Sequence, residues 1–131
     1  PRCPCSRFNL PQFTELARSY GDRIGFGVVV LSPDEYTIEE IQEKMGMDLP
    51  VTFDRSLAEA CGVYSTPQAV LMDADHKLYY RGNYNKSRYC ADRATNYAHM
   101  AIDSLLGHHT ELHPDRAALV SYGCDLTNCR K

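Results

Sequence analysis

The spacing of apolar residues over the first quarter of the chain predicts a helix followed by a buried strand. Residues 6–20 carry a mostly apolar face at helical spacing, and Gly21 is expected to stop this helix. Pro11 lies inside the pattern, so we expect a kink or an irregular first turn. The valine-rich run over residues 23–32 predicts the buried strand. The predicted buried face of the helix comprises Asn9, Phe13, Leu16, Ala17 and Tyr20, of which all but Asn9 are apolar or aromatic.

Two more helices are predicted before the middle of the chain. The first covers residues 33–47, where early acidic residues favour the N-terminal end. An extended segment over residues 49–54 leads to a short helix over residues 56–63. Ser56 is the expected N-cap of that short helix, and Gly62 is its expected stop. The buried stripe of the longer helix should be Ile38, Ile41 and Met45.

The second half of the chain predicts a β-hairpin and a final helix. The hairpin strands cover roughly residues 68–72 and 77–82, with a turn at "DADHK". The final helix covers residues 92–107, and residues 108–131 show no periodicity and are expected to form an extended tail. The apolar face of the final helix should be Tyr97, Ala98, Ala101, Ile102 and Leu105.

This order of helices and strands is typical of an α/β fold. Two strands separated by a helix need a crossover connection, and the hairpin adds antiparallel strands. We therefore expect a mixed β-sheet flanked by helices. Residues 1–107 should form this domain, and residues 108–131 should form a C-terminal tail that contains cysteine and histidine.

Composition and charge narrow the classes of partner. The chain has 131 residues, enough for one domain with a hydrophobic core. The net charge is −3 and no basic stripe is present, which argues against nucleic acid as a partner. No apolar run approaches the ~20 residues of a membrane-spanning helix, so no span is expected. No signal peptide is recognisable at the abrupt start of the sequence.

Six cysteines are more than a reduced cytosolic protein of this size usually carries. They allow up to three disulfides, whose pairing the sequence leaves open. This content favours an oxidising compartment, such as the bacterial periplasm or cell envelope. The cysteines are Cys3, Cys5, Cys61, Cys90, Cys124 and Cys129.

Two segments together resemble the thioredoxin-like redoxins. They are "CPCSRFNLP" from residue 3 and "FDRSLAEACGVYSTPQAVLMDADHKLYYRGNYN" from residue 53. The resemblance is to the alkyl hydroperoxide reductase/thiol-specific antioxidant group and to the cytochrome-maturation thioredoxins, and it covers residues 3–106. It implies a thioredoxin-like fold in which Cys3 begins a helix. It also implies a cis peptide bond between Thr66 and Pro67.

Several features depart from that family's pattern. Ser6 stands where a dithiol thioredoxin has its resolving cysteine, and Cys5 occupies a position that is usually another residue. His76 replaces the glycine of the hairpin turn, which the turn tolerates if His76 is left-handed. The family places a central strand before the cysteine helix, yet only two residues precede Cys3. We therefore expect a fragment, a misassigned start, or a subunit whose strand comes from elsewhere.

The resemblance implies a thiol chemistry centred on Cys3. A cysteine at a helix N-terminus can have its pKa lowered from ~8.5 into the range ~3.5–7.5, which makes it a nucleophilic thiolate. Cys3 is expected to attack a disulfide and form a mixed disulfide. Cys5, a distant thiol or an external thiol would then resolve it. Ser6 could donate a hydrogen bond to the thiolate, and a substrate chain could pair with the backbone at Thr66.

The remaining cysteines and histidines have less specific expectations. Cys61 should be a small buried thiol, and Cys90 should form a disulfide with the tail. Cys124 and Cys129 could pair locally, pair with Cys90, or resolve Cys3. Neither a metal nor a cofactor is expected, because the tail histidines lack the spacing of a structural zinc site. Those histidines are His108, His109 and His113.

The function predicted from these residues is that of a thiol–disulfide oxidoreductase. Its substrates would be protein or small-molecule thiols and disulfides. A thiol peroxidase is the alternative enzyme, in which Cys3 attacks peroxide and becomes a sulfenic acid. A redox-inactive thioredoxin-like module that binds a partner or a metal is the non-enzymatic alternative.

Overall fold

The protein alternates helices and short strands, as an α/β chain does. The computed structural model describes residues 3–31, 36–86, 90–107, 116–120 and 124–125. The elements are α1 Pro4–Tyr20, β1 Val28–Val29, α2 Ile38–Met45, β2 Val51–Thr52, α3 Arg55–Ala60, β3 Ser65–Thr66, β4 Ala69–Met72, β5 Leu78–Gly82, the 3₁₀ turn η1 Arg93–Thr95, α4 Tyr97–Leu105, α5 Arg116–Leu119 and β6 Cys124–Asp125. None of the described helices is long and apolar enough to cross a membrane.

The strands form three separate two-stranded sheets, so the expected single mixed sheet is wrong for the described residues. β1 pairs with β2 in parallel, while β4 pairs with β5 and β3 pairs with β6 in antiparallel. In the part of the chain that the structure describes, four of the six strands are two residues long, and each strand pairs with one described neighbour. Such short strands offer few ladder hydrogen bonds.

The first helix begins earlier than its apolar spacing predicts. Cys3 is the N-cap and Pro4 occupies the first helical position, where the missing N–H of proline costs nothing. α1 is one continuous helix through Pro11 rather than a helix with an irregular first turn. The Pro11 carbonyl accepts a hydrogen bond from the Thr14 hydroxyl at 3.0 Å. The expected face is confirmed, because Asn9 and three of its apolar residues are buried.

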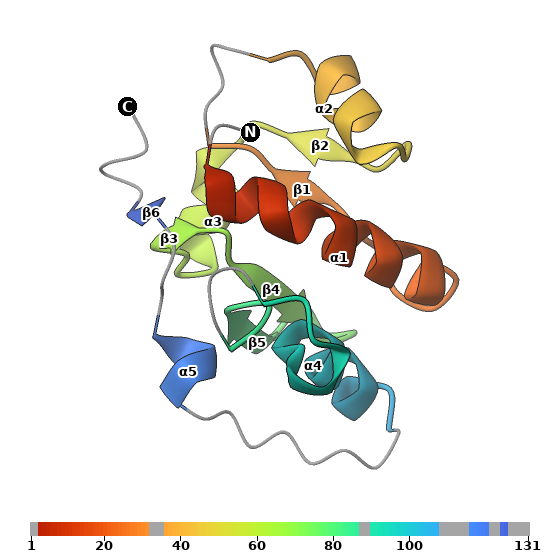
Figure 1. Ribbon diagram of the computed structural model, residues 1–131, viewed down its shortest axis with the longest axis vertical. Helices are drawn as coiled ribbons and strands as arrows, with labels where there is room; N and C mark the ends of the chain where they lie inside the picture. The colour runs from red at the N-terminus through yellow and green to blue at the C-terminus, as the bar shows by residue number, and fades with distance from the viewer. Residues whose placement is uncertain (1–2, 32–35, 87–89, 108–115, 121–123, 126–131) are drawn as a thin grey trace.

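α1 joins the two halves of the molecule because neighbouring residues of its buried face enter different hydrophobic clusters. Leu16 and Tyr20 pack with Ile102 of α4 and with partly buried residues of β4. Leu10 and Phe13 pack against the cluster that α2 and the β1–β2 pair form. Figure 1 shows α1 lying between these two groups of elements. The helix that carries Cys3 is therefore packed against both clusters.

The start of α2 is determined by its N-cap residue, Thr37. The Thr37 hydroxyl accepts a hydrogen bond from the Glu40 amide at 3.2 Å, and the Glu40 carboxylate accepts one from the Thr37 amide at 2.8 Å. Ile41 and Met45 are buried as expected, but Ile38 is 39% exposed. Ile38 is the first residue after the cap, which places it at the rim of α2 rather than over the core.

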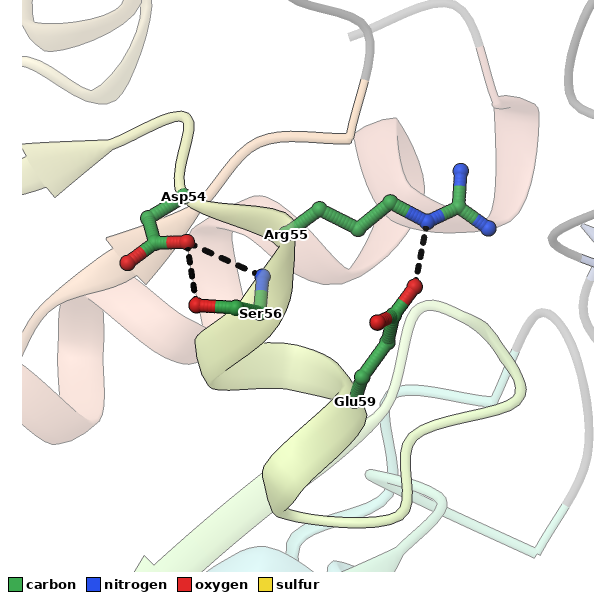
Figure 2. Close-up of polar contacts among 4 residues, drawn as sticks. All are labelled: Asp54, Arg55, Ser56 and Glu59. Atoms are coloured by element: carbon green, nitrogen blue, oxygen red, sulfur yellow. Dashed lines mark hydrogen bonds and ion pairs between the residues drawn. The ribbon is translucent and has the colours of Figure 1, made fainter.

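The short helix α3 is capped by Asp54, not by Ser56 as expected. Figure 2 shows the Asp54 carboxylate accepting hydrogen bonds from the Ser56 amide at 3.0 Å and from the Ser56 hydroxyl at 2.6 Å. Arg55 and Glu59 form an exposed ion pair of 3.0 Å one turn apart on the same helix. Asp54 and Ser56 are both good capping residues, and the helix begins after the more N-terminal one.

Asp54 should make the stability of the fold depend on pH. The two hydrogen bonds from Ser56 lower the pKa of Asp54 below its ordinary value of 3.8. The stabilisation is therefore present above pH 3.8 and is lost as the pH falls through the folded-state pKa.

We expect Asp54→Ala to lower the thermal unfolding midpoint at neutral pH, whereas in acid the midpoints of this variant and of the parent protein should converge. Asp54→Asn should keep the cap and lose the pH dependence. Glu59→Gln is the control for removing a carboxylate from α3, and an equal effect there would contradict the prediction.

The hairpin is confirmed, with β4 and β5 in the expected places. His76 has a φ of 58°, so the residue that replaces glycine is left-handed. The Asp73 carboxylate accepts hydrogen bonds from the Asp75 amide at 2.9 Å and from the Lys77 amide at 3.0 Å. This side chain closes the turn without a glycine.

The predicted final helix is divided into η1 and α4. The Asn96 side chain accepts a hydrogen bond from the His99 amide at 3.0 Å, and this cap starts α4 at Tyr97. Ala98, Ala101 and Ile102 of the expected face are buried. The tail is not entirely irregular either, because it contains α5 and β6.

Candidate thiol site at the N-terminus of the first helix

Cys3 lies at the start of α1, where the helix presents its unsatisfied amides. Its backbone is extended, with φ −62° and ψ 120°, and its carbonyl accepts a hydrogen bond from the Arg7 amide at 3.0 Å. Cys3 is partly buried. Backbone N–H groups and the helix dipole both stabilise negative charge at this position. The local sequence alone therefore builds an environment that suits a thiolate.

The tertiary structure brings Thr66 to this cysteine. The Cys3 thiol donates a hydrogen bond to the Thr66 carbonyl oxygen with an Sγ···O distance of 3.6 Å. The peptide bond between Thr66 and Pro67 is cis, as the resemblance implies. The Gln68 side chain accepts a hydrogen bond from the Tyr64 amide at 3.0 Å, which ties together the two flanks of this loop. A segment distant in sequence is thus held against Cys3.

Cys5 and Ser6 differ in how far their side chains are exposed to solvent. Cys5 is 3% exposed, so its side chain is in the interior. Its carbonyl accepts a hydrogen bond from the Asn9 side chain at 2.8 Å. Ser6 is partly buried in the first turn, and the structure shows no hydrogen bond from its hydroxyl to another described residue. Of the "CPCS" residues, Cys3 is the one that the structure places beside the Thr66 backbone.

The outer edge of the Thr66 segment is occupied by β6. β3 and β6 are antiparallel, with Ser65 opposite Asp125 and Thr66 opposite Cys124. Figure 1 shows both strands near the first turn of α1. The sequence does not predict this pairing, because two-residue strands leave no hydrophobic pattern.

Cys90 is held beside the middle of α1. Its carbonyl accepts a hydrogen bond from the Gln12 side chain at 3.3 Å, and its Sγ lies 3.8 Å from the Thr95 hydroxyl. Gln12 is nine residues after Cys3, or about 13 Å along the helix axis. In the part of the chain that the structure describes, Cys90 is an unbridged thiol, and the expected disulfide with the tail is not seen.

The other candidate ligands and thiols lie apart from this site. Cys61 is the C-cap of α3 and is partly exposed, so the expected small buried thiol is wrong. Its carbonyl accepts a hydrogen bond from the Arg81 guanidinium at 3.2 Å. Among the described side chains, no group of three His, Cys, Asp or Glu could hold a metal ion. Cys129, His108, His109 and His113 lie outside the described residues.

A second polar cluster joins the end of α1 to α4. The Tyr20 hydroxyl donates a hydrogen bond to the Asp103 carboxylate, and His99 Nε2 lies 2.8 Å from the same hydroxyl. His99 Nε2 is also 3.2 Å from Asp103. The Arg23 guanidinium lies 4.9 Å from the centre of the Tyr20 ring. Sequence spacing predicted Tyr20 as an apolar-face residue but did not predict its polar partners, because they come from another helix.

Tyr20 should lose its proton at a higher pH than an ordinary tyrosine. Burial, followed by the hydrogen bond to Asp103 and its charge, raises the pKa of Tyr20 from 10.0 to about 12. Protonated Tyr20 therefore contributes stability that is fully present below pH 10.0 and is lost as the pH rises through about 12. A titration of tyrosinate ultraviolet absorbance should show one late component that Tyr20→Phe removes. Asp103→Asn should move this component to lower pH, and a parent protein without a late component would contradict the assignment.

The comparisons with known proteins leave the family open. No family model matches the chain, and no curated protein matches it significantly.

Proposed function

We propose that the protein is a thiol–disulfide oxidoreductase of thioredoxin-like fold, with Cys3 as its nucleophile. The observation that carries the proposal is the position of the Cys3 thiol. It lies at the N-terminus of α1 and 3.6 Å from the backbone carbonyl of Thr66, next to the cis bond to Pro67. A stabilised thiolate beside an extended backbone segment is the arrangement that attack on a peptide-borne disulfide needs.

The first chemical step forms one S–S bond and breaks another. The Cys3 thiolate attacks a substrate disulfide along the S–S axis, forms a mixed disulfide and expels the other substrate sulfur as a thiolate. The α1 amides stabilise the Cys3 thiolate before the attack. The Thr66 segment would pair with the extended substrate chain and place its disulfide over Cys3.

Burial makes Cys5 a poor candidate for the second thiol. A thiol that is 3% exposed cannot reach a mixed disulfide without opening the first turn of α1. Ser6 has no thiol and cannot close a disulfide. Cys5 therefore contributes to packing in this proposal, and resolution falls to a thiol outside the "CPCS" segment.

The test is the rate of Cys3 alkylation against pH, followed by peptide mass spectrometry before and after reduction. We expect the midpoint of this rate to lie below the ~8.5 of an ordinary cysteine. The reduced protein should also accelerate insulin reduction. An unreactive Cys3 after reduction, or a midpoint of an ordinary thiol, would refute the proposal. Rapid peroxide consumption without insulin reduction would favour the thiol peroxidase instead.

A further inference from the structure

The segment Ala118–Val120 is attached to the end of β5 by Asn83. The Asn83 amide donates a hydrogen bond to the Ala118 carbonyl at 2.8 Å, and its side chain donates one to the Val120 carbonyl at 2.8 Å. Asn83 is 1% exposed, so both bonds are shielded from water. A Cβ on Gly82 would overlap the Ala118 carbonyl, which shows how closely the two backbones approach. Ala118 itself is 1% exposed and belongs to a core cluster.

Tyr64 links the same segment directly to the loop that faces Cys3. Its hydroxyl donates a hydrogen bond to the Leu119 carbonyl at 2.8 Å, although its ring is 45% exposed. Tyr64 lies two residues before Thr66. The chain that precedes β6 is therefore attached to both β5 and the Thr66 loop.

The register of β6 then places Cys124 beside the Thr66 segment that faces Cys3. Cys124 lies opposite Thr66, whose carbonyl is the partner of the Cys3 thiol. Opposite residues of an antiparallel pair have Cα atoms about 4.5–5.5 Å apart. The Thr66 backbone thus lies next to Cys124 in the strand pair and next to Cys3 through the hydrogen bond of the thiol.

We infer that Cys124 is the resolving thiol of Cys3. This inference rests on the proposed function. A substrate strand that pairs with Thr66 takes the edge that β6 occupies, so substrate binding displaces β6. Cys124 follows the attached segment Ala118–Val120 by four residues. The displaced Cys124 therefore stays close to Cys3, and its thiol has a high effective concentration near the mixed disulfide.

The resolving step balances without any further reactant. The Cys124 thiolate attacks Cys3 Sγ of the mixed disulfide, and the Cys3–Cys124 bond forms as the bond to the substrate breaks. The substrate leaves as a thiolate and takes up a proton from water. Over both steps the substrate disulfide is reduced to two thiols, and the Cys3 and Cys124 thiols are oxidised to one disulfide.

The experiment uses the full chain, reduced and then mixed with oxidised glutathione, with the products followed by peptide mass spectrometry. The parent protein should accumulate a Cys3–Cys124 disulfide and little glutathione adduct. Cys124→Ser should instead accumulate the glutathione adduct on Cys3. Cys129→Ser is the matched control in the same tail and should behave like the parent. Circular dichroism checks that each variant keeps the secondary structure of the parent protein.

A second variant tests the placement of Cys124 without removing a thiol. Tyr64→Phe keeps the ring and removes the hydrogen bond to Leu119, so adduct resolution should slow by roughly two- to ten-fold, the worth of one hydrogen bond. The rate of adduct formation should not fall.

The outcomes separate this inference from the proposed function. A parent protein that keeps the glutathione adduct as Cys124→Ser does, or that joins Cys3 to another cysteine, overturns the inference and leaves Cys3 as the nucleophile. Absence of any adduct or disulfide at Cys3 in all variants overturns both.

Discussion

Cys3→Ser should lower the rate of insulin reduction by roughly a hundred-fold or more, because a serine hydroxyl is not ionised at neutral pH and cannot carry out thiol exchange. Cys3 is the cysteine that the structure places at the helix N-terminus and against the Thr66 carbonyl. The measurement is the initial rate of insulin reduction with excess external thiol, which keeps the enzyme reduced. External thiol also bypasses the resolving step, so this assay reports on the nucleophile alone.

The substitution should leave the fold intact. Serine is preferred over cysteine as an N-cap, so α1 should start as well or better in the variant. Cys61→Ser is the matched control, since Cys61 caps the end of α3 and makes no described contact with Cys3. Its rate should stay within about two-fold of the parent. A Cys3→Ser variant with the parental rate would show that another group performs the attack.

Ile102→Ala should lower the free energy of unfolding by about 2–5 kcal/mol, the range for truncating a buried large aliphatic residue. Ile102 is 5% exposed and packs with Leu16 and Tyr20 of α1. The substitution removes apolar contacts between the site helix and α4 and leaves a cavity behind. Whole domains are stable by about 5–15 kcal/mol, so this loss is a large share of the total. The measurement is the midpoint and slope of urea unfolding.

Leu57→Ala is the control for this prediction because it makes a similar truncation on the surface. Leu57 lies on α3 and is 44% exposed. Its effect should stay within about 0.5 kcal/mol. Equal effects at Ile102 and Leu57 would contradict the view that the α1–α4 cluster is a close-packed core.

Local sequence was sufficient for elements whose own residues start and stop them. The hairpin lies where alternation and "DADHK" predict it, because the Asp73 side chain closes the turn from within. The end of α3 follows from Gly62, which is left-handed with φ 72°. The predictions were wrong where more than one residue could cap the start of a helix. Asp54 rather than Ser56 caps α3, and Asn96 divides the last predicted helix.

Local sequence failed for the strand pairing. Apolar runs predicted where strands lie, but the number of residues that enter a ladder depends on the neighbour that each strand meets. Two-residue strands carry no alternation, so neither the separate sheets nor the β3–β6 pair could be expected from their pattern. Burial of Asn83 and Asn85 was equally unpredictable, because their side-chain amides donate hydrogen bonds to the carbonyl groups of Val120 and Asp92.

The sequence by itself determined that α1 has an apolar face and that a hairpin follows the Thr66–Pro67 step. These are properties of neighbouring residues, namely the apolar spacing along α1 and the "DADHK" turn. Only the tertiary structure decided that the Thr66 carbonyl meets the Cys3 thiol, that Cys5 is buried, and that Cys124 lies opposite Thr66. Each of these depends on where chain segments far apart in sequence are packed, and that is set by the core around α1 and by the hydrogen bonds of Asn83.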